Sequence, residues 1–338
     1  MQREVPNVEL PPIPVVDTGP AFPLETLALQ EPRARALMDC ATAGVSPRLL
    51  RMLDAVSRRW LARQGSIHLD EIDAIAARLA RPGVYFLSVN YEWGCTCRVG
   101  PSPDGRGARL VRVLDWVTGG LGRYIIAARV AGPAGPFVSL TWPGYTGVLQ
   151  AMAPGRFSAA LNQAPMRSLF GVFHLDWALG RGRVWRMRHP APTHLLREVF
   201  ETAATFAEAK RMLTERPIST PAIFSIAGVQ PNETAVIERT EDDARVHDGG
   251  NTAANHWQTP GWRGLSRGND SPGRACQMHR VPMELDAHFE WLTPPILNWN
   301  TRLAMAADAR EGRLVARGYE PASRAAAPAT APLVLDVS

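Results

Sequence analysis

Two cysteines, Cys95 and Cys97, stand one residue apart near the middle of the chain, directly after Gly94, in the stretch GCTC. A cysteine thiol can bind a metal, form a disulfide, fill a core as a small apolar group or act as a nucleophile. A structural zinc site needs four nitrogen or sulfur ligands, and neither a second cysteine pair nor a histidine pair lies near this stretch. We therefore expect no metal here.

The two other cysteines, Cys40 and Cys276, are single and far away. Four cysteines in 338 residues do not make a disulfide scaffold. The first residues lack a positively charged region ahead of an apolar stretch, so they do not resemble a secretion signal, and we expect free thiols in a cytoplasmic protein. A bridge from the pair to Cys40 or Cys276 stays open, and composition alone favours buried structural thiols.

Composition limits the classes of protein. A chain of 338 residues with 46% hydrophobic content can bury a large core. It has no run of about 18 apolar residues, so we expect no integral membrane segment. The net charge of +5 comes from arginine, because Lys210 is the only lysine. The arginines are spread singly and without interleaved aromatic residues, so we expect no nucleic-acid partner.

Helices are expected in the first third of the chain. Residues 1–25 are rich in proline and predict an extended surface arm. Ser46 as N-cap, Pro47 at the first helical position and Gly65 as a stop predict a helix between them. Residues 69–79 predict a second, shorter helix. The apolar stripe expected to face inward on the first of these is Leu49, Leu50, Leu53, Val56, Trp60 and Leu61.

Short β-rich runs separated by Gly, Pro and Asp follow Cys95 and predict an antiparallel meander. Two helices are expected next, the second opened by the capping box of Thr205 and Glu208. Strands resume after Pro221 and end in a hairpin that turns near Gly312, and residues 320–338 are expected to be a mobile tail. Strands, helices and strands in this order predict an α+β fold in which stacked antiparallel sheets carry helices outside.

Five short motifs occur in a fixed order along the chain. They are GCT at 94–96, RVLDW at 112–116, GYTG at 144–147, LNQ at 161–163 and ANHW at 254–257. This succession resembles the choloylglycine hydrolase and acid ceramidase superfamily of N-terminal-nucleophile (Ntn) cysteine amidases, in particular acid ceramidase and N-acylethanolamine acid amidase. The resemblance extends through 206–240 and 292–315, and it implies the αββα sandwich of Ntn hydrolases.

The resemblance implies that the chain cuts itself between Gly94 and Cys95. Residues 1–94 would then form a small helical subunit, and residues 95–338 a catalytic subunit that stays bound to it as an αβ heterodimer. Cys95 would be the nucleophile, and its new α-amine, with a pKa of about 7.7 to 8, would be the neighbouring base. Cys97 stands where serine is common and has no implied catalytic duty.

Further site residues are implied by the same motifs. Asp115 would hold the α-amine, and Arg112 would lie near the thiolate and favour its charged form. Asn162 and Asn255 match the positions of the oxyanion site, with Asn255 favoured as the side-chain donor. Val113 replaces the usual asparagine, which leaves one neighbouring polar contact in doubt.

The remaining matches are weaker. Gln163 stands where acid ceramidase-like members carry glutamate, so a carboxylate role is lost there. Arg274, in DSPGR, matches a late arginine of the site. His256 is expected to be structural because the α-amine already supplies the base. The aromatic positions Trp116, Trp142 and Tyr145 are candidates for substrate binding, and ordinary core packing is the alternative for them.

The sequence therefore predicts an amidohydrolase that needs neither metal nor cofactor. Its expected substrate is a small N-acyl amide with a fatty or other apolar acyl group, of the ceramide or N-acylethanolamine kind. An acyltransferase of the penicillin acyltransferase type, a non-catalytic binding protein and a precursor that needs acid or a partner to mature remain alternatives.

Overall fold

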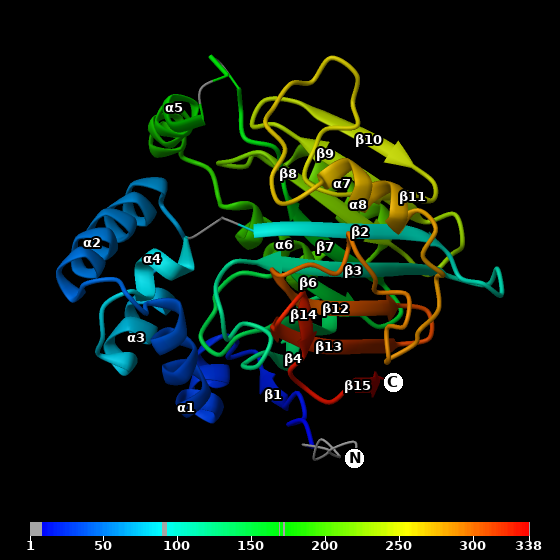
Figure 1. Ribbon diagram of the computed structural model, residues 1–338, viewed down its shortest axis with the longest axis horizontal. Coiled ribbons are helices and arrows are strands. Elements are labelled where there is room, and N and C mark those ends of the chain that lie inside the picture. The colour runs from blue at the N-terminus through cyan, green and yellow to red at the C-terminus, as the bar shows by residue number, and fades with distance from the viewer. Residues whose placement is uncertain (1–8, 90–92, 169, 172, 338) are drawn as a thin grey trace, which may run out of the picture.

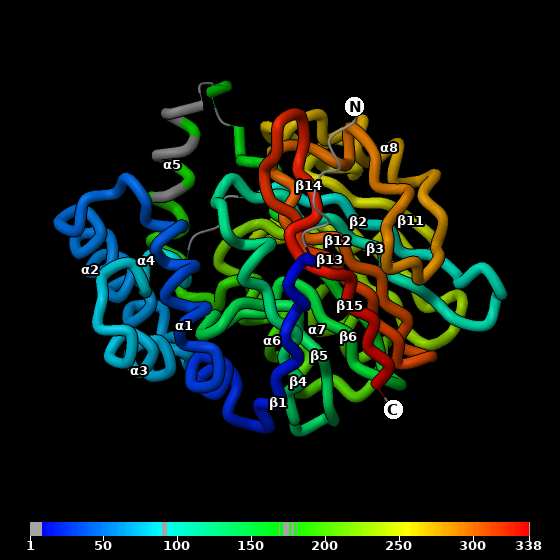
Figure 2. Tube along the Cα trace, turned by 60° about the horizontal axis from the view of Figure 1, so that its bottom comes forward, coloured from blue at the N-terminus to red at the C-terminus, as the bar shows by residue number. Residues whose placement is uncertain are grey.

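The computed structural model describes residues 9–89, 93–168, 170–171 and 173–337. Its strands form two sheets, one of eight strands in the order β1-β4-β5-β6-β7-β8-β9-β10 and one built on the order β11-β2-β3-β12-β13-β14, with β15 paired to β13. Figures 1 and 2 show the sheets stacked, with helices at the outside. Strand β2 of one sheet contacts β7, β8 and β9 of the other.

The bounds of the strands follow the β-rich runs of the sequence. In the eight-stranded sheet they are β1 Val15–Gly19, β4 Ile126–Gly132, β5 Gly135–Thr141, β6 Gln150–Ala153, β7 Phe157–Gln163, β8 Ala222–Ala227, β9 Thr234–Arg239 and β10 Ala244–Asp248. In the other sheet they are β2 Trp93–Pro101, β3 Ala108–Trp116, β11 Asn251–Ala253, β12 Thr301–Asp308, β13 Arg313–Pro321, β14 Ala326–Pro328 and β15 Leu333–Asp336.

Helices cover both outer faces of this sandwich. Helices α6 (Pro192–Thr202) and α7 (Phe206–Glu215) pack on the eight-stranded sheet, and α8 (Ser271–Met278) packs on β2 and β11 of the other. Helices α1 (Leu24–Ala41), α2 (Pro47–Gln64), α3 (Leu69–Leu79) and α4 (Val84–Ser88) gather at one side of the sheets, and α5 (Phe173–Arg186) lies above them in Figure 1. The expected helix-sheet-sheet-helix layering of an α+β protein is confirmed.

Local signals in the sequence predict both ends of helix α2 correctly, but only part of its buried face. The hydroxyl of Ser46 accepts a hydrogen bond from the backbone N–H of Leu49, and Gly65 ends the helix with φ of 66°. Leu50, Trp60 and Leu61 are buried as expected. Leu49 and Val56 are instead exposed, because α3 and α4, which pack on α2, cover a narrower stripe of the helix than its apolar residues span.

Three expectations about the chain are corrected. The arm of residues 1–25 contains β1, which pairs in parallel with β4 and thus joins the sheet. Strand β3 does not belong to the meander of β4 to β7, since it pairs with β2 and β12 in the other sheet. The tail is paired as well, because β14 and β15 both bond to β13 and bury Ala326 and Leu335.

Every helix in the described ranges is too short or too polar to cross a lipid bilayer. The same residues contain no group of three His, Cys, Asp or Glu side chains that could hold a metal ion.

Candidate active site

Cys95 lies near the start of β2, in the seven-stranded sheet and facing the eight-stranded one, where its side chain is fully buried. Its thiol is 2.9 Å from Nη2 of Arg112, on the neighbouring strand β3, and 3.9 Å from the carbonyl oxygen of Leu161 on β7. Its backbone N–H donates to Oδ1 of Asn255 at 2.8 Å. Both the sulfur and the backbone nitrogen of Cys95 are therefore held by defined partners.

Arg112 is buried without a carboxylate partner among the described residues. Its guanidinium donates to the carbonyl oxygens of Leu149 at 2.5 Å and Leu161 at 2.8 Å, besides contacting the Cys95 thiol. Burial raises the pKa of that thiol, and the positive charge of Arg112 opposes the increase. The arginine is thus placed where a thiolate would form.

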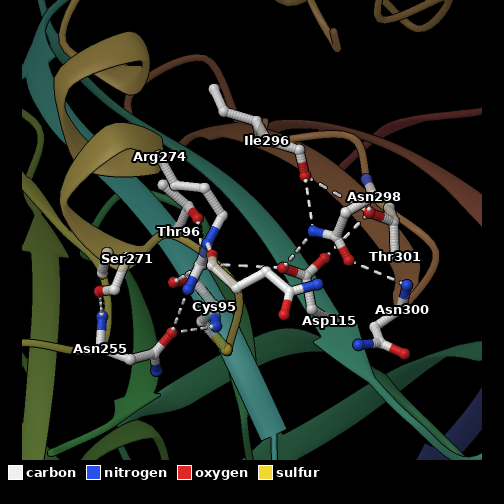
Figure 3. A network of polar contacts seen from close by, with 12 residues as sticks. Cys95, Thr96, Asp115, Asn255, Ser271, Arg274, Ile296, Asn298, Asn300 and Thr301 are labelled. Carbon is white, nitrogen blue, oxygen red and sulfur yellow. Dashed lines mark hydrogen bonds and ion pairs between the residues drawn. The ribbon is translucent and has the colours of Figure 1, made fainter. Parts of the chain in front are cut away.

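Arg274 connects the residues around Cys95 with Asp115, as Figure 3 shows. It is fully buried at the start of α8 and donates to the carbonyl oxygen of Cys95 at 2.8 Å and to Oγ1 of Thr96 at 2.7 Å. It also donates to Oδ1 of Asn255 at 3.0 Å and lies 3.6 Å from the carboxylate of Asp115. The late arginine of the sequence motif is therefore part of the same network as Cys95.

Asp115 ends β3 opposite Gly94 in the register of β2 and β3. Its carboxylate accepts hydrogen bonds from Nδ2 of Asn298 and from the hydroxyl of Thr301, both at 2.9 Å. Burial raises the pKa of Asp115, and Arg274 together with these two donors opposes the increase. Sequence reasoning missed Asn298 and Thr301, although both lie in the polar stretch LNWNT, whose last residue, Thr301, begins the buried strand β12.

Gly94 lies close to this carboxylate. A Cβ atom added to Gly94 would lie 3.4 Å from Cβ of Asp115 and 3.7 Å from Oδ1 of Asn255. A methyl group would meet ordinary contacts there, whereas a longer side chain would collide with both groups.

Asn255 is held from several sides. Its Nδ2 donates to the carbonyl oxygen of Gln163 at 2.8 Å, and its backbone N–H donates to the hydroxyl of Ser271 at 2.7 Å. The same hydroxyl lies 2.8 Å from Nδ1 of His256, whose pKa is lowered by burial. His256 therefore contacts the residue that positions Asn255. Ser271 was missed as well, although it follows the N-cap Asp270.

Asn162, at the end of β7, is fully buried beside this network. Its Nδ2 donates to the carbonyl oxygens of Ala253 at 3.2 Å and Ala254 at 3.3 Å, just before Asn255 in the chain. The neighbouring Gln163 accepts a hydrogen bond from the backbone N–H of Trp93 through Oε1 at 3.0 Å.

Two cavities flank the site. The larger, of about 290 Å³, lies between α2, α5 and the end of β7, and Asn162, Gln163 and Trp93 are part of its wall. The smaller, of about 100 Å³, is lined by apolar side chains of α1, α3 and α4 and by the three predicted aromatic residues Trp116, Trp142 and Tyr145.

The predicted aromatic residues form one row. Trp93 contacts Trp116 with ring centroids 5.0 Å apart, and Trp116 contacts Trp142 edge to face at 5.9 Å. Trp142 in turn contacts Tyr145 at 5.9 Å. Since Trp93 lines the larger cavity and Trp116 the smaller, this stacked pair separates the two cavities.

Comparison with known proteins finds acid ceramidases among the sequence relatives. Human acid ceramidase is 32% identical over 108 residues, which cover 32% of this chain and 26% of that protein, and cattle acid ceramidase is 33% identical over 105 residues. The chain is therefore similar in sequence to acid ceramidases over about a third of its length. The match spans about a quarter of the length of these acid ceramidases. No family model matches the chain.

Solved structures of the superfamily align with the chain more loosely. The N-acylethanolamine-hydrolyzing acid amidase ortholog of Caenorhabditis elegans aligns with a TM-score of 0.49 and 21% identity, over 63% of this chain and 92% of that one. A conjugated bile acid hydrolase mutant of Clostridium perfringens aligns with a TM-score of 0.41 and 11% identity, over 72% of this chain and 92% of that one.

Proposed function

We propose that this protein is an autoprocessing cysteine amidase of the acid ceramidase and choloylglycine hydrolase superfamily that hydrolyses N-acyl amides through a thioester on Cys95. One observation carries the proposal: the Cys95 thiol lies against Arg112 while the backbone nitrogen of the same residue is bonded to Asn255. A nucleophile whose own nitrogen is held at the site can use that nitrogen as its base once the preceding bond is cut.

Self-cleavage is the first step of this proposal. The Cys95 sulfur attacks the carbonyl carbon of Gly94, the carbon–nitrogen bond breaks, and the nitrogen takes up a proton. Water then hydrolyses the resulting thioester, leaving a carboxylate on Gly94 and a free thiol and α-amine on Cys95. Before cleavage this nitrogen is an amide without basicity, so the intact chain lacks the base.

Amide hydrolysis repeats the chemistry on a substrate. The neutral α-amine accepts the thiol proton, the sulfur adds to the substrate carbonyl, and the collapse of the tetrahedral intermediate releases the amine with that proton. Water hydrolyses the thioester to the acid. Arg112 stabilises the thiolate, Asp115 accepts a hydrogen bond from the α-ammonium group, and Asn255 offers its second amide hydrogen to the oxyanion.

The two fragments are proposed to stay together as an αβ heterodimer divided after Gly94. Strand β1 of the first fragment pairs with β4 of the second, and the backbone N–H of Ala331 donates to the carbonyl oxygen of Pro11 at 2.9 Å. Glu71 on α3 is paired with Arg197 on α6, with Oε2 and Nη1 2.6 Å apart. These contacts do not involve the bond between Gly94 and Cys95.

The walls of the cavities support an apolar acyl group. The smaller cavity has almost only aliphatic and aromatic walls, and the larger one combines Trp60, Val184 and Trp185 with polar side chains near β7. We propose fatty acyl amides as substrates, by analogy with acid ceramidase and the N-acylethanolamine-hydrolyzing amidase. Trp116, Trp142 and Tyr145 would contact the acyl chain in the smaller cavity.

Hydrolysis assays on the cleaved protein test the proposal. A panel of ceramide, N-acylethanolamines and N-acyl amino acids is incubated with the wild-type protein and with Cys95→Ala, and the released fatty acid is measured by mass spectrometry. We expect release by the wild type alone. An added acceptor amine separates hydrolysis from acyl transfer, because a transferase would form the new amide in place of the acid. A cleaved wild-type protein that consumes no amide of the panel would contradict the proposal.

A further inference from the structure

The amide oxygen of Asn162 is a buried hydrogen-bond acceptor beside the active site network. The side chain is fully buried, and Oδ1 has no hydrogen-bond partner among the described residues. Nearly all buried polar atoms in folded proteins are bonded, and Asn162 is one of the residues that line the larger cavity, so the unpaired acceptor points to a ligand that supplies the donor.

The orientation of this amide is set by its neighbours. Nδ2 donates to the carbonyl oxygens of Ala253 and Ala254. An amide nitrogen carries two hydrogens, and both are used by these carbonyl groups. Turning the amide over would place Oδ1 against two oxygens, so the group must present an oxygen, and not a nitrogen, to the remaining side.

The backbone around Asn162 touches the groups that hold the nucleophile. The carbonyl oxygen of Leu161, the preceding residue, lies 3.9 Å from the Cys95 sulfur and accepts a hydrogen bond from Arg112. Ala254 directly precedes Asn255, whose side chain holds the Cys95 nitrogen. Asn162 is therefore connected to Cys95 both through the preceding residue, Leu161, and through Ala254, which adjoins Asn255.

We propose that Oδ1 of Asn162 accepts a hydrogen bond from the N–H of the scissile amide and so restricts the protein to amides that carry this hydrogen. The inference rests on the proposed amidase function and makes Asn162 a residue of substrate specificity in place of an oxyanion donor. When the N–H is bonded to Oδ1, the lone pair that the nitrogen gains in the tetrahedral intermediate points away from Asn162. N-alkylated amides lack the donor and would leave the buried oxygen unpaired, which sites of this kind penalise strongly.

Three dodecanoyl compounds test the inference because each releases dodecanoate. They are dodecanoyl ethanolamide, its N-methyl derivative and the dodecanoyl ester of ethylene glycol. We expect the cleaved wild-type protein to have a kcat/KM for the secondary amide at least about 100-fold above that for the N-methyl amide. Equal values for the two amides would overturn the inference. Hydrolysis of the ester with neither amide consumed would contradict the proposed amidase function itself.

Two variants separate hydrogen bonding from the bulk of the methyl group. Asn162→Leu keeps the volume but removes the acceptor, so the ratio between the two amides should fall at least tenfold while ester hydrolysis persists. Ser158→Ala removes a buried unpaired hydroxyl from the same strand, outside the lining of either cavity, and should keep the wild-type ratio. An equal loss for all three compounds in Asn162→Leu would show a merely structural role and overturn the inference.

Discussion

Two buried polar clusters contain arginine, but their charges are balanced differently. At the active site, the carboxylate of Asp115 lies 3.6 Å from Arg274 and accepts its closer hydrogen bonds from uncharged groups, while Arg112 has no carboxylate partner among the described residues. At the seam between α3 and α6, Arg197 is paired with the carboxylates of Glu71 at 2.6 Å and Glu201 at 2.7 Å.

This difference in charge balance distinguishes a candidate catalytic site from an ion-pair cluster that holds two helices together, which we call a clamp. A buried arginine that donates mainly to a thiol and to carbonyl oxygens keeps positive charge available for a developing thiolate or oxyanion. An arginine between two carboxylates is already neutralised and mainly holds two elements together. We therefore expect changes at the active site to abolish reactions, and changes at the seam to lower stability while the reactions persist.

The largest contrast is expected between the two cysteines of β2. Cys95→Ala should abolish both self-cleavage and amide hydrolysis. Cys97 lies on the same face of the strand, and burial raises the pKa of its thiol to about 12, partly offset by a hydrogen bond with Ser225. Cys97→Ala should keep both reactions and lose about 1 kcal/mol of stability. Gel electrophoresis and dodecanoate release report the reactions, and a Cys97→Ala protein that neither cleaves nor hydrolyses would break the comparison.

Arg112→Met should slow self-cleavage and lower kcat/KM by roughly 100-fold to 1,000-fold, since it removes a cation that contacts the Cys95 thiol. Arg156→Met is the matched control, because Arg156 is also buried and donates to the carbonyl oxygens of Phe200 and Ala203 far along the chain from the thiol. It should lower thermal stability and keep the cleavage rate. A similar loss of cleavage in both variants would show that Arg112 acts only through packing.

At the seam between α3 and α6 we expect the opposite pattern, in which stability falls while the reactions persist. Arg197→Met should leave self-cleavage intact but lower the free energy of unfolding by about 3 kcal/mol, because two partly buried carboxylates lose their partner. Size-exclusion chromatography of the cleaved protein should show earlier loss of the small fragment as urea is added. Loss of cleavage with unchanged fragment retention would contradict the assignment of this cluster as a clamp.

A smaller effect is expected from pH at the same seam. Burial, together with His68 and Arg197, lowers the pKa of His194 well below 6.5. The folded protein keeps this histidine neutral where the unfolded chain is protonated, so its contribution to stability is complete above about pH 6.5 and is lost as the pH falls below that value.

Melting temperatures at pH 7.5 and 5.5 measure this contribution. His194→Gln should reduce the difference between the two pH values by the equivalent of about 1 kcal/mol. His279→Gln, at an exposed histidine, should leave the difference unchanged. A wild-type slope retained in His194→Gln would assign the pH dependence to another group.

Local signals in the sequence were sufficient where structure is decided by neighbours along the chain. Ser46 and Gly65 fixed the ends of α2 because caps depend on a few consecutive residues. The placement of β3 beside β12 was not foreseen, since alternation in a strand does not state which strand becomes its neighbour. The paired tail was missed for the same reason.

The residues of the candidate site likewise divide into those that the sequence predicts and those that only the fold brings together. Its predicted residues came from motifs whose order resembles a known superfamily, and the structure places Arg112 against the Cys95 thiol and Asp115 near Arg274, which also contacts Cys95. Asn298 and Thr301 could not be chosen from the sequence, because only the fold brings them to Asp115. The direction of the Asn162 amide likewise depends on carbonyl groups of a distant segment.

The first residue of the large fragment tests the central claim most directly. Intact-mass analysis and N-terminal sequencing of the purified protein should find, for the chain printed here, fragments of 94 and 244 residues, the second beginning Cys-Thr-Cys. Cys95→Ala should stay whole. A wild-type chain that stays whole at every pH between 4 and 9, or a cut at any other bond, would contradict the account.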